Sequence, residues 1–278
     1  MTGLVFGESP RWHDGRLWFV DFGAQEVGAV DLQGSQELIT RTPGMPMGIG
    51  FMTGGQLLIV SVRDGKLLRR EPDGSLVVHA DLSTLSHHPW GELVVDGRDA
   101  YVGNLPFEFP GGQFAPGTVT LVRPDGGVRH VAAEVAFPNG MAVTPDNSTL
   151  ILAETYAHRL TAFDIAADAS LSNRRVWADL GDAFPNGICL DSEGAVWYAD
   201  VPRKRCERVR EGGDVVQTIE LDRGCFACTL GGEDGRTLFI MAAEYGGARD
   251  AGPARTGQVV AVQVAAAVLN GHTASAHA

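Results

Sequence analysis

The chain contains the segment Phe137-Pro138-Asn139-Gly140-Met141-Ala142-Val143, and 47 residues later it repeats the pattern as Phe184-Pro185-Asn186-Gly187-Ile188-Cys189-Leu190. In both copies an Asn-Gly pair opens an apolar run of the kind that forms β-strands. A repeat of about 40 to 50 residues is typical of the blades of a β-propeller. The two copies therefore predict a fold that is built from similar β-sheet units.

Turns and strands recur at the same phase along the rest of the chain. Pairs such as Asp14-Gly15, Asp73-Gly74 and Asp125-Gly126 supply the positive φ angles that tight hairpins require. Six apolar second strands can be read, at residues 17–21, 57–61, 100–104, 150–154, 196–200 and 238–242. Helical periodicity is almost absent, and a sheet of three or four strands cannot bury both faces alone. We therefore predict an all-β fold, a six-bladed β-propeller, because an immunoglobulin-type sandwich would show no six-fold phase.

The composition favours one domain that binds neither nucleic acid nor membrane. No linker divides the 278 residues, so we expect a single domain over 1–278, with a frayed tail at about 265–278. The net charge of −12 lacks the positive footprint that nucleic acids and anionic membranes require, although an acidic surface also simply favours solubility. No apolar run approaches the roughly 20 residues that cross a bilayer, and no signal peptide is visible. We expect a cytoplasmic protein.

The four cysteines are too few for a disulfide scaffold: they are Cys189, Cys206, Cys225 and Cys228. Cys225 and Cys228 have a C-x-x-C spacing, but neither a second pair nor a thioredoxin-like context accompanies it. We therefore interpret all four as small apolar side chains, in preference to a metal or redox site.

Residues at one phase of a propeller form a ring, because the innermost strand of each blade runs along the central channel. Counting back about five residues from each first turn gives Glu8, Met47, Gly91, Asn139, Asn186 and Ala227. One carboxylate and two amides in this ring, with no Lys or Arg, favour a hard cation such as Ca²⁺, Mg²⁺ or Mn²⁺. Alternatively, each Asn-Gly pair only begins its strand with a turn.

Several of these segments resemble one known family. Glu8-Ser9-Pro10-Arg11-Trp12, Phe137-Pro138-Asn139-Gly140, Pro185-Asn186-Gly187-Ile188-Cys189-Leu190-Asp191 and Trp197-Tyr198-Ala199-Asp200 are similar to motifs of the senescence-marker-protein/gluconolactonase/luciferin-regenerating-enzyme family, which includes regucalcin. The resemblance covers Glu8 to about Val264. It implies a six-bladed propeller, hydrolysis of lactones or esters, and one divalent cation in the channel, with Ca²⁺ expected first and Zn²⁺, Mn²⁺ or Mg²⁺ as alternatives.

The resemblance also implies individual roles. Glu8 and Asn139 match the family's metal-binding Glu and Asn, and Asn186 stands where the family usually has a metal-binding Asp. Gly91 replaces an Asn of the family, whereas Glu92 keeps the acid that follows it. An Asn at 186 brings no negative charge and cannot accept a proton, so we expect weaker metal binding. The sequence is therefore compatible with a weakened lactonase, with changed chemistry on the same scaffold, or with an inactivated variant.

For lactone hydrolysis the substrate carbonyl would be polarised by the cation while a base takes a proton from water. Glu92 is the candidate base, helped or replaced by His87 or His88, which could equally be an exposed loop pair. Two rival functions stay open. One is a metal-dependent lyase, isomerase or cyclase, and the other is a propeller that binds a small molecule or a protein without catalysis.

The substrate is expected to be a small molecule, and we predict no oligomeric state. The ends of the second strands form a further ring of Asp21, Ser61, Asn104, Glu154, Asp200 and Ala242. The residues expected to bind substrate are Gly91, Asn104, Phe107, Glu154, Tyr156 and Asp200. Residues 105–117 have the composition of a lid, and Phe107, Phe109 and Phe114 within them favour a hydrophobic or aromatic substrate over a bare sugar acid.

Overall fold

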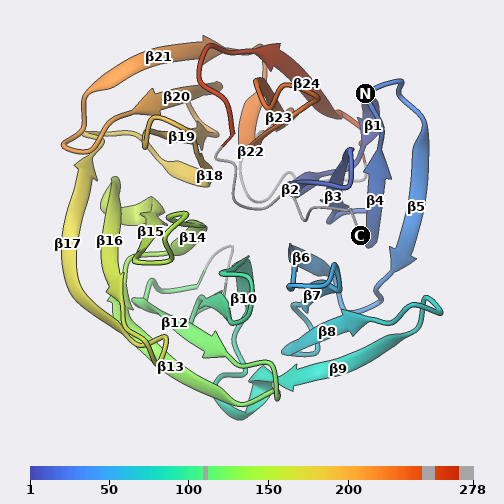
Figure 1. The fold of residues 1–278 in the computed structure, drawn as a ribbon, viewed down its shortest axis with the longest axis vertical. Coiled ribbons are helices and arrows are strands. Elements are labelled where there is room, and N and C mark those ends of the chain that lie inside the picture. The colour runs from blue at the N-terminus through green and yellow to red at the C-terminus, as the bar shows by residue number, and fades with distance from the viewer. Residues whose placement is uncertain (109–111, 246–253, 269–278) are drawn as a thin grey trace.

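The computed structural model describes residues 1–108, 112–245 and 254–268. Its strands form six four-stranded antiparallel sheets that are arranged as blades around a central axis (Figure 1). This confirms the predicted six-bladed β-propeller. Phe109, which the sequence placed in the lid, and residues 269–278 of the expected tail lie outside the described residues.

Each blade runs outward from an inner strand at the axis. Blade 1 consists of β2 (Gly7–His13), β3 (Arg16–Asp21), β4 (Glu26–Val30) and β5 (Gln36–Arg41). Blade 2 consists of β6 (Pro46–Phe51), β7 (Leu57–Ser61), β8 (Lys66–Arg70) and β9 (Leu76–Asp81). Blade 3 consists of β10 (Trp90–Val95), β11 (Ala100–Asn104), β12 (Gly117–Val122) and β13 (Val128–Val135).

The second half of the chain repeats this order. Blade 4 consists of β14 (Pro138–Val143), β15 (Thr149–Glu154), β16 (Arg159–Ile165) and β17 (Leu171–Asp179). Blade 5 consists of β18 (Pro185–Leu190), β19 (Val196–Asp200), β20 (Arg205–Val209) and β21 (Val215–Glu220). Blade 6 consists of β22 (Gly224–Gly231), β23 (Thr237–Ala243), β24 (Gly257–Gln263) and the N-terminal β1 (Thr2–Leu4).

The N-terminal strand closes the ring. β1 pairs with β24, and the ammonium group of Met1 donates a hydrogen bond to the carbonyl oxygen of Val259 (3.1 Å). The last blade therefore takes its outer strand from the start of the chain, and closure hides strand edges that would otherwise be open. Near the other end Val268 forms an isolated bridge with Asp191, so residues 265–268 lie against blades 5 and 6 instead of fraying.

The hydrophobic core lies between the blades. Every residue of β7, β11 and β19 is buried, because these second strands are covered on both faces by neighbouring blades. One such layer packs Trp90 and Leu93 of blade 3 against Leu58 and Val60 of blade 2. The outer strands are far more exposed.

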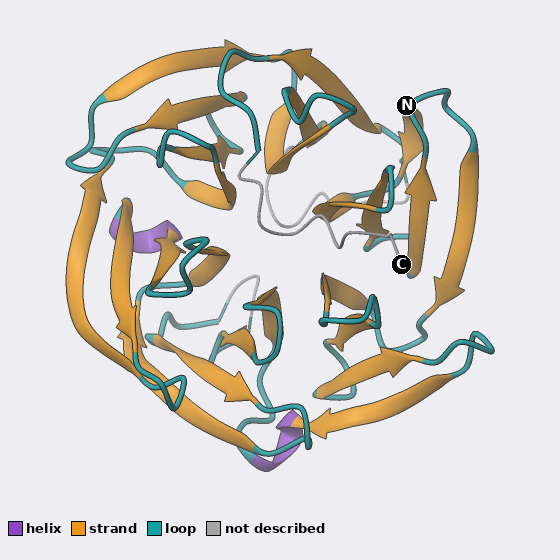
Figure 2. Cartoon of the chain, viewed as in Figure 1, coloured by secondary structure: helices purple, strands orange, loops and turns teal. Residues whose placement is uncertain are grey.

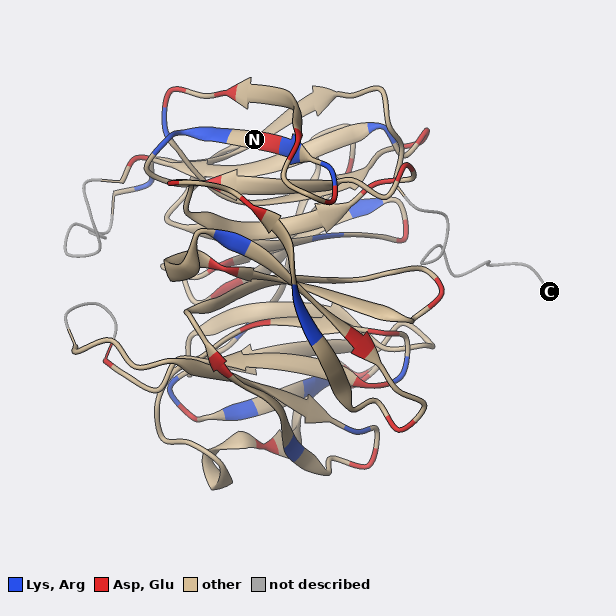
Figure 3. Ribbon diagram, turned by 90° about the vertical axis from the view of Figure 1, so that its left-hand side faces the viewer, with Lys and Arg blue, Asp and Glu red and all other residues tan. Residues whose placement is uncertain are grey.

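Helices contribute little to this architecture. Two short 3-10 turns, η1 (Leu82–Thr84) and η2 (Thr155–Ala157), are the only helices of the described residues (Figure 2). In that part of the chain no helix has the length and apolar character that a membrane span needs. Basic and acidic residues are interspersed along the ribbon that Figure 3 shows.

Candidate functional site

The inner strand of each blade is shifted in register against its second strand near the same end. The shifts fall between Glu8 and Arg11, Pro46 and Ile49, Trp90 and Leu93, Pro138 and Met141, Pro185 and Ile188, and Cys225 and Ala227. A β-bulge of this kind places an additional residue on the bulged strand and redirects side chains. The inner strands surround the axis in Figure 1, and bulge residues of five of them line one small cavity: Ser9, Glu92, Gly140, Gly187 and Ala227.

The first residue of the bulge defines what we call the upper ring. In four blades it follows the residue that pairs with the last residue of the second strand, as Asn139 follows Pro138. In blade 1 the residue that the sequence predicts, Glu8, pairs with Val20 and stands directly before the bulge. In blade 6 Cys225 pairs with Ala242, so the equivalent residue is Phe226 and the expected Ala227 is corrected. The prediction from the sequence is wrong in blade 6 because the number of residues between the ring position and the following turn differs among the blades. The upper ring is Glu8, Met47, Gly91, Asn139, Asn186 and Phe226.

The amide of Asn139 has a defined orientation. Its nitrogen donates to the hydroxyl of Thr155 (3.2 Å), and that hydroxyl donates in turn to the carbonyl oxygen of Pro185 (2.7 Å). A hydroxyl has a single proton, so towards Asn139 it can only accept. The Asn139 group that faces Thr155 must therefore be the NH₂, and its carbonyl oxygen is left for a ligand. Asn186, one blade further, is half-buried and makes no side-chain hydrogen bond within the described residues.

Glu8 is the only acid of the upper ring, and its surroundings disfavour its charge. Burial and, to a lesser extent, the neighbouring Glu92 carboxylate raise the pKa of Glu8 to about 8. A bound cation would offset both effects. In residues 1–108, 112–245 and 254–268 no three His, Cys, Asp or Glu side chains are placed to hold a metal ion together. Two of the three oxygen donors of the upper ring are amides and so do not belong to these residue types.

A second set of bulge residues, the lower ring, lies one residue further along each strand. Its members are Ser9, Gly48, Glu92, Gly140, Gly187 and Ala227. The inner strands approach so closely here that a Cβ added at Gly187 would lie 2.5 Å from the Cβ of Ala227. Five small residues therefore surround one acid, Glu92, which is 7% exposed. Burial raises the pKa of Glu92, although Arg11 and Ser9 act in the opposite direction.

The two histidines proposed as alternative bases do not line the small cavity at this constriction. His87 and His88 are exposed, on the connection between η1 and β10. The backbone of His88 is held in place, since its carbonyl oxygen accepts a hydrogen bond from Asn104 (3.2 Å). Neither imidazole has a hydrogen-bond partner among the described residues. The structure thus brings Glu92, but not the histidines, into the channel.

Three residues that the sequence predicts to bind substrate form hydrogen bonds to the backbone instead. Asn104, Glu154 and Asp200 are 2%, 0% and 0% exposed, so their side chains are not available at a surface. Each is bonded to the segment that enters the inner strand of its blade: Asn104 Nδ2 donates to Pro89 O (2.9 Å), Ala136 N to Glu154 Oε2 (2.8 Å) and Phe184 N to Asp200 Oδ2 (3.2 Å). They support the walls of the site from behind, and their positions do not support contact with substrate.

Aromatic side chains form a rim around the channel mouth, on the strand connections at the same end as the upper ring. One side holds Phe107, Phe114, Phe137 and Tyr156, with ring centroids 5.5 Å apart for Phe114 and Tyr156. The other side holds Phe6, Phe226 and Tyr245, with Phe226 and Tyr245 also 5.5 Å apart. Burial raises the pKa of Tyr245, and the electrostatic effect of Tyr156 raises it further. The two sides of the aromatic rim are therefore neighbours. Phe114, Tyr156 and Tyr245 are 46%, 41% and 38% exposed, which leaves their rings free to meet a ligand.

The four cysteines gather between blades 5 and 6. Cys189 on β18 and Cys228 on β22 have their Sγ atoms 4.0 Å apart, and both belong to the apolar layer around Trp197 and Leu238. Their thiols and that of Cys206 have pKa values well above the ordinary one, chiefly through burial and hydrogen bonds to one another. Buried protonated thiols are unreactive, in agreement with the apolar interpretation.

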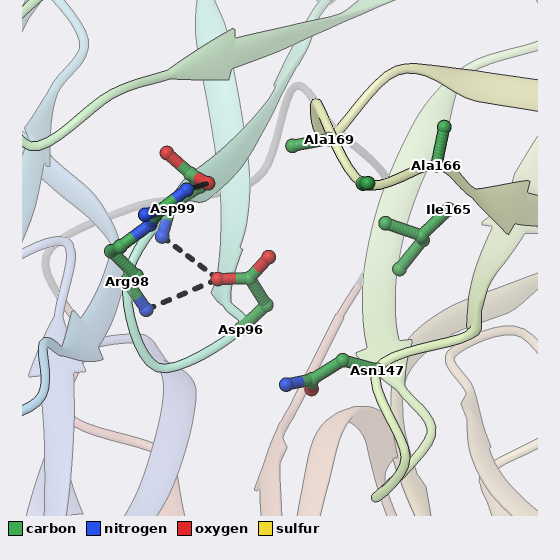
Figure 4. A pocket seen from close by; sticks show the side chains of 8 residues that line it. Asp96, Arg98, Asp99, Asn147, Ile165, Ala166 and Ala169 are labelled. Carbon is green, nitrogen blue, oxygen red and sulfur yellow. Dashed lines mark hydrogen bonds and ion pairs between the residues drawn. The ribbon is translucent and has the colours of Figure 1, made fainter.

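Away from the rings, a cleft of about 290 Å³ lies between blades 3 and 4, beside the β10–β11 turn (Figure 4). Asp96 on its wall accepts hydrogen bonds from the backbone amides of Arg98 and Asp99 (3.1 and 2.7 Å). Ile165, Ala166 and Ala169 form the facing wall. The carboxylate thus holds its own turn, and the cleft contains none of the ring residues.

Known proteins and one family model are similar to this chain over most of its length. The family model described as the SMP-30/Gluconolactonase/LRE-like region matches residues 6–244. The 6-deoxy-6-sulfogluconolactonase of Pseudomonas putida is 27% identical over 256 residues, which cover 85% of this chain and 82% of the relative. Regucalcin of Gallus gallus is 28% identical over 252 residues, which cover 86% and 84%. A solved luciferin-regenerating enzyme superposes with a TM-score of 0.84 at 17% identity, covering 98% and 96% of the two chains, and so shows the shared fold.

Proposed function

The chain belongs to the SMP-30/gluconolactonase/LRE-like family, and from this we propose that it hydrolyses lactones or related carboxylic esters with one divalent cation in the channel. Glu8, Asn139 and Asn186 would hold the cation. The observation that carries the proposal is the upper ring, where these three side chains come from three blades. The amide oxygen of Asn139 is not used by Thr155, its only side-chain hydrogen-bond partner among the described residues. One of the relatives named above is a sulfogluconolactonase, and this similarity supports lactone chemistry.

The donor set suits a hard cation. Carboxylate and amide oxygens are the ligands that Ca²⁺ prefers, so we propose Ca²⁺ first and Mg²⁺, Mn²⁺ or Zn²⁺ as alternatives. A single carboxylate contributes little charge, and we expect correspondingly weak binding. When bound, such a cation polarises the carbonyl of the substrate and stabilises the oxyanion that develops on it.

We assign the proton transfer to Glu92. It lies in the lower ring, one level below the upper ring, in a water-poor constriction where its carboxylate can accept a proton from water and later return it to the leaving oxygen. His87 and His88 are the alternative bases, and both are exposed on the connection that leads into β10. We also propose that the protein acts in the cytoplasm, where its four free cysteines would stay reduced.

The aromatic rim supports a hydrophobic or aromatic substrate. Phe114, Tyr156 and Tyr245 are the exposed rings of this rim, and they offer mainly apolar surface beside the upper ring. Hydroxyl-rich sugar lactones would gain little from such a surface. Burial of one aromatic group is worth about 1.5–3 kcal/mol. We therefore expect an aryl lactone to be preferred over gluconolactone by at least about tenfold in kcat/KM, since about 1.4 kcal/mol corresponds to a factor of ten.

Metal analysis of the purified protein, followed by turnover of gluconolactone, dihydrocoumarin and phenyl acetate with and without chelator, tests the proposal. Hydrolysis that a chelator abolishes and one added cation restores supports it. Glu8→Gln should lose this activity, whereas the exposed Glu211→Gln serves as the control. Bound metal without hydrolysis would point to other chemistry at the same site, such as elimination or isomerisation. A protein that takes up no metal would point to a ligand-binding propeller.

The substrate class is tested separately at the rim. Phe114→Ala removes a ring that is 46% exposed and should raise KM for dihydrocoumarin about three- to tenfold while leaving gluconolactone unchanged. Leu38→Ala, on an outer strand and 47% exposed, is the matched control and should change neither. Equal effects of Phe114→Ala on both substrates would contradict an aromatic binding surface.

A further inference from the structure

Arg11 crosses the channel from blade 1 to blade 3. Its Nη2 donates to Glu92 Oε2 (3.1 Å) and to the carbonyl oxygen of Leu93 (2.8 Å), and its Nη1 donates to the carbonyl oxygen of Pro10 (2.9 Å). Three acceptors on two blades therefore hold one planar guanidinium group. The ring predicted from the sequence contains no Lys or Arg, and Arg11 lies two residues beyond the lower-ring position of its strand.

Ser9 supplies a second donor to the same oxygen. Its hydroxyl accepts a hydrogen bond from the backbone amide of Ile49 (2.9 Å) and donates to Glu92 Oε2 (3.1 Å), so its single proton is directed at the carboxylate. Ser9 has a φ of 49°, a left-handed conformation that a non-glycine residue adopts only where its surroundings enforce it. The bulge of β2 thus holds Ser9 in a strained geometry that places this hydroxyl beneath Glu92.

The other oxygen of Glu92, Oε1, is buried and has no hydrogen-bond partner within the described residues. Next to Glu92 lies a small cavity of about 10 Å³ whose walls include Gly140, Gly187 and Ala227. This is about the space that one water molecule needs. A buried carboxylate oxygen without a hydrogen bond is costly, which is the expected condition of an atom reserved for a ligand.

We propose that Ser9 and Arg11 are positioning residues which hold Oε2 of Glu92 so that Oε1 faces the cavity as the proton acceptor. The inference rests on the proposed function. In hydrolysis the water oxygen forms a bond to the carbonyl carbon while Oε1 takes its proton, and the ester C–O bond then breaks as Glu92 returns that proton to the leaving oxygen. A base must lie about 2.6–3.2 Å from the atom it deprotonates, and a carboxylate held at one oxygen meets this requirement in every turnover.

Kinetics of Ser9→Ala, Arg11→Gln and Glu92→Gln, with dihydrocoumarin and a titration of Ca²⁺ by calorimetry, test the proposal. We expect Ser9→Ala and Arg11→Gln to lower kcat about 10- to 100-fold, with KM and Ca²⁺ affinity each within about twofold of wild type. Arg11→Lys keeps one donor and should recover part of kcat. Arg210→Gln, an exposed arginine on blade 5, is the control, and thermal unfolding verifies that each variant is folded.

The double variant Ser9→Ala/Glu92→Gln separates positioning from a merely structural role. If Ser9 acts through Glu92, the double variant has the kcat of Glu92→Gln alone, because the carboxylate that Ser9 orients is already gone. Multiplicative losses, or a change in KM and Ca²⁺ affinity at unchanged kcat, would overturn the positioning role while leaving the proposed function intact. Full activity of Glu92→Gln would overturn both the role of Ser9 and Arg11 and the assignment of the base. A wild-type protein without hydrolysis would overturn the proposed function and this inference with it.

Discussion

Asn139 on an inner strand is held by Thr155 on the turn that follows the second strand of the same blade, through a 3.2 Å hydrogen bond from its amide nitrogen to the hydroxyl. Thr155 in turn donates to the backbone of the next blade at Pro185. The orientation of a candidate metal ligand is therefore decided by a contact between two blades. A residue that offers no chemistry of its own controls which atom of Asn139 is presented to the channel.

Replacement of Thr155 should consequently weaken metal binding. In Thr155→Val the Asn139 amide can rotate and lose its preferred orientation, so we expect the Ca²⁺ affinity to fall about three- to tenfold. Thr155→Ser keeps the hydroxyl and should retain wild-type affinity. Calorimetric titration measures both, and equal affinities in the two variants would show that Thr155 does not orient the amide.

Asn186→Asp should strengthen the site. The substitution adds a second negative charge to the upper ring, and the affinity of such sites depends on the charge count of the ligands. We expect about tenfold tighter Ca²⁺ binding and a higher rate of lactone hydrolysis. Asn173→Asp, on the exposed outer strand β17, adds the same charge away from the channel and should change neither. Unchanged values in Asn186→Asp would place the cation elsewhere.

Gly91→Asn should add an oxygen without disturbing the fold. A Cβ built at Gly91 has no neighbour closer than the carbonyl oxygen of Gly103 at 3.9 Å, so the ring has room for a side chain there. We expect normal thermal stability and a several-fold gain in Ca²⁺ affinity. Gly187→Ala is the contrasting variant: its Cβ would lie 2.5 Å from that of Ala227, and overpacking of this kind costs about 1–3 kcal/mol.

Glu8 should make the stability of the metal-free protein depend on pH. Its pKa is about 8 in the folded chain and near the ordinary 4.5 when unfolded. Between these values the folded state binds one more proton than the unfolded state, so the free energy of unfolding falls as the pH rises, by up to about 1.4 kcal/mol per pH unit. Unfolding by urea at several pH values measures the slope. Glu8→Gln should remove it, and saturating Ca²⁺ should reduce it; a slope that persists in Glu8→Gln would assign it to another group.

The repeated Asn-Gly segments predict the fold and much of the site, because the six-fold pattern of turns and apolar strands can be read from local sequence. From that phase alone Glu8, Met47, Gly91, Asn139 and Asn186 are predicted to share one ring. The strand register gives Met47, Gly91, Asn139 and Asn186 equivalent positions in four blades, whereas Glu8 stands directly before the bulge of its blade. The same pattern predicts Glu92 one residue beyond Gly91. The apolar character of residues 105–117 similarly indicates the part of the rim that Phe107 and Phe114 form.

Only the tertiary structure decided the remaining features. Phe226 replaces Ala227 in the upper ring because the number of residues between the ring position and the following turn differs in β22, and a shift of one residue moves a side chain to the other face of a strand. Asn104, Glu154 and Asp200 have the polarity of ligand-binding residues, but burial and backbone partners make them supports. The pairing of Glu92 with Ser9 and Arg11, 83 and 81 residues away in the chain, depends on how closely neighbouring blades approach the axis. A repeat pattern specifies which residues are equivalent, whereas the distances between them are set by packing across the blades.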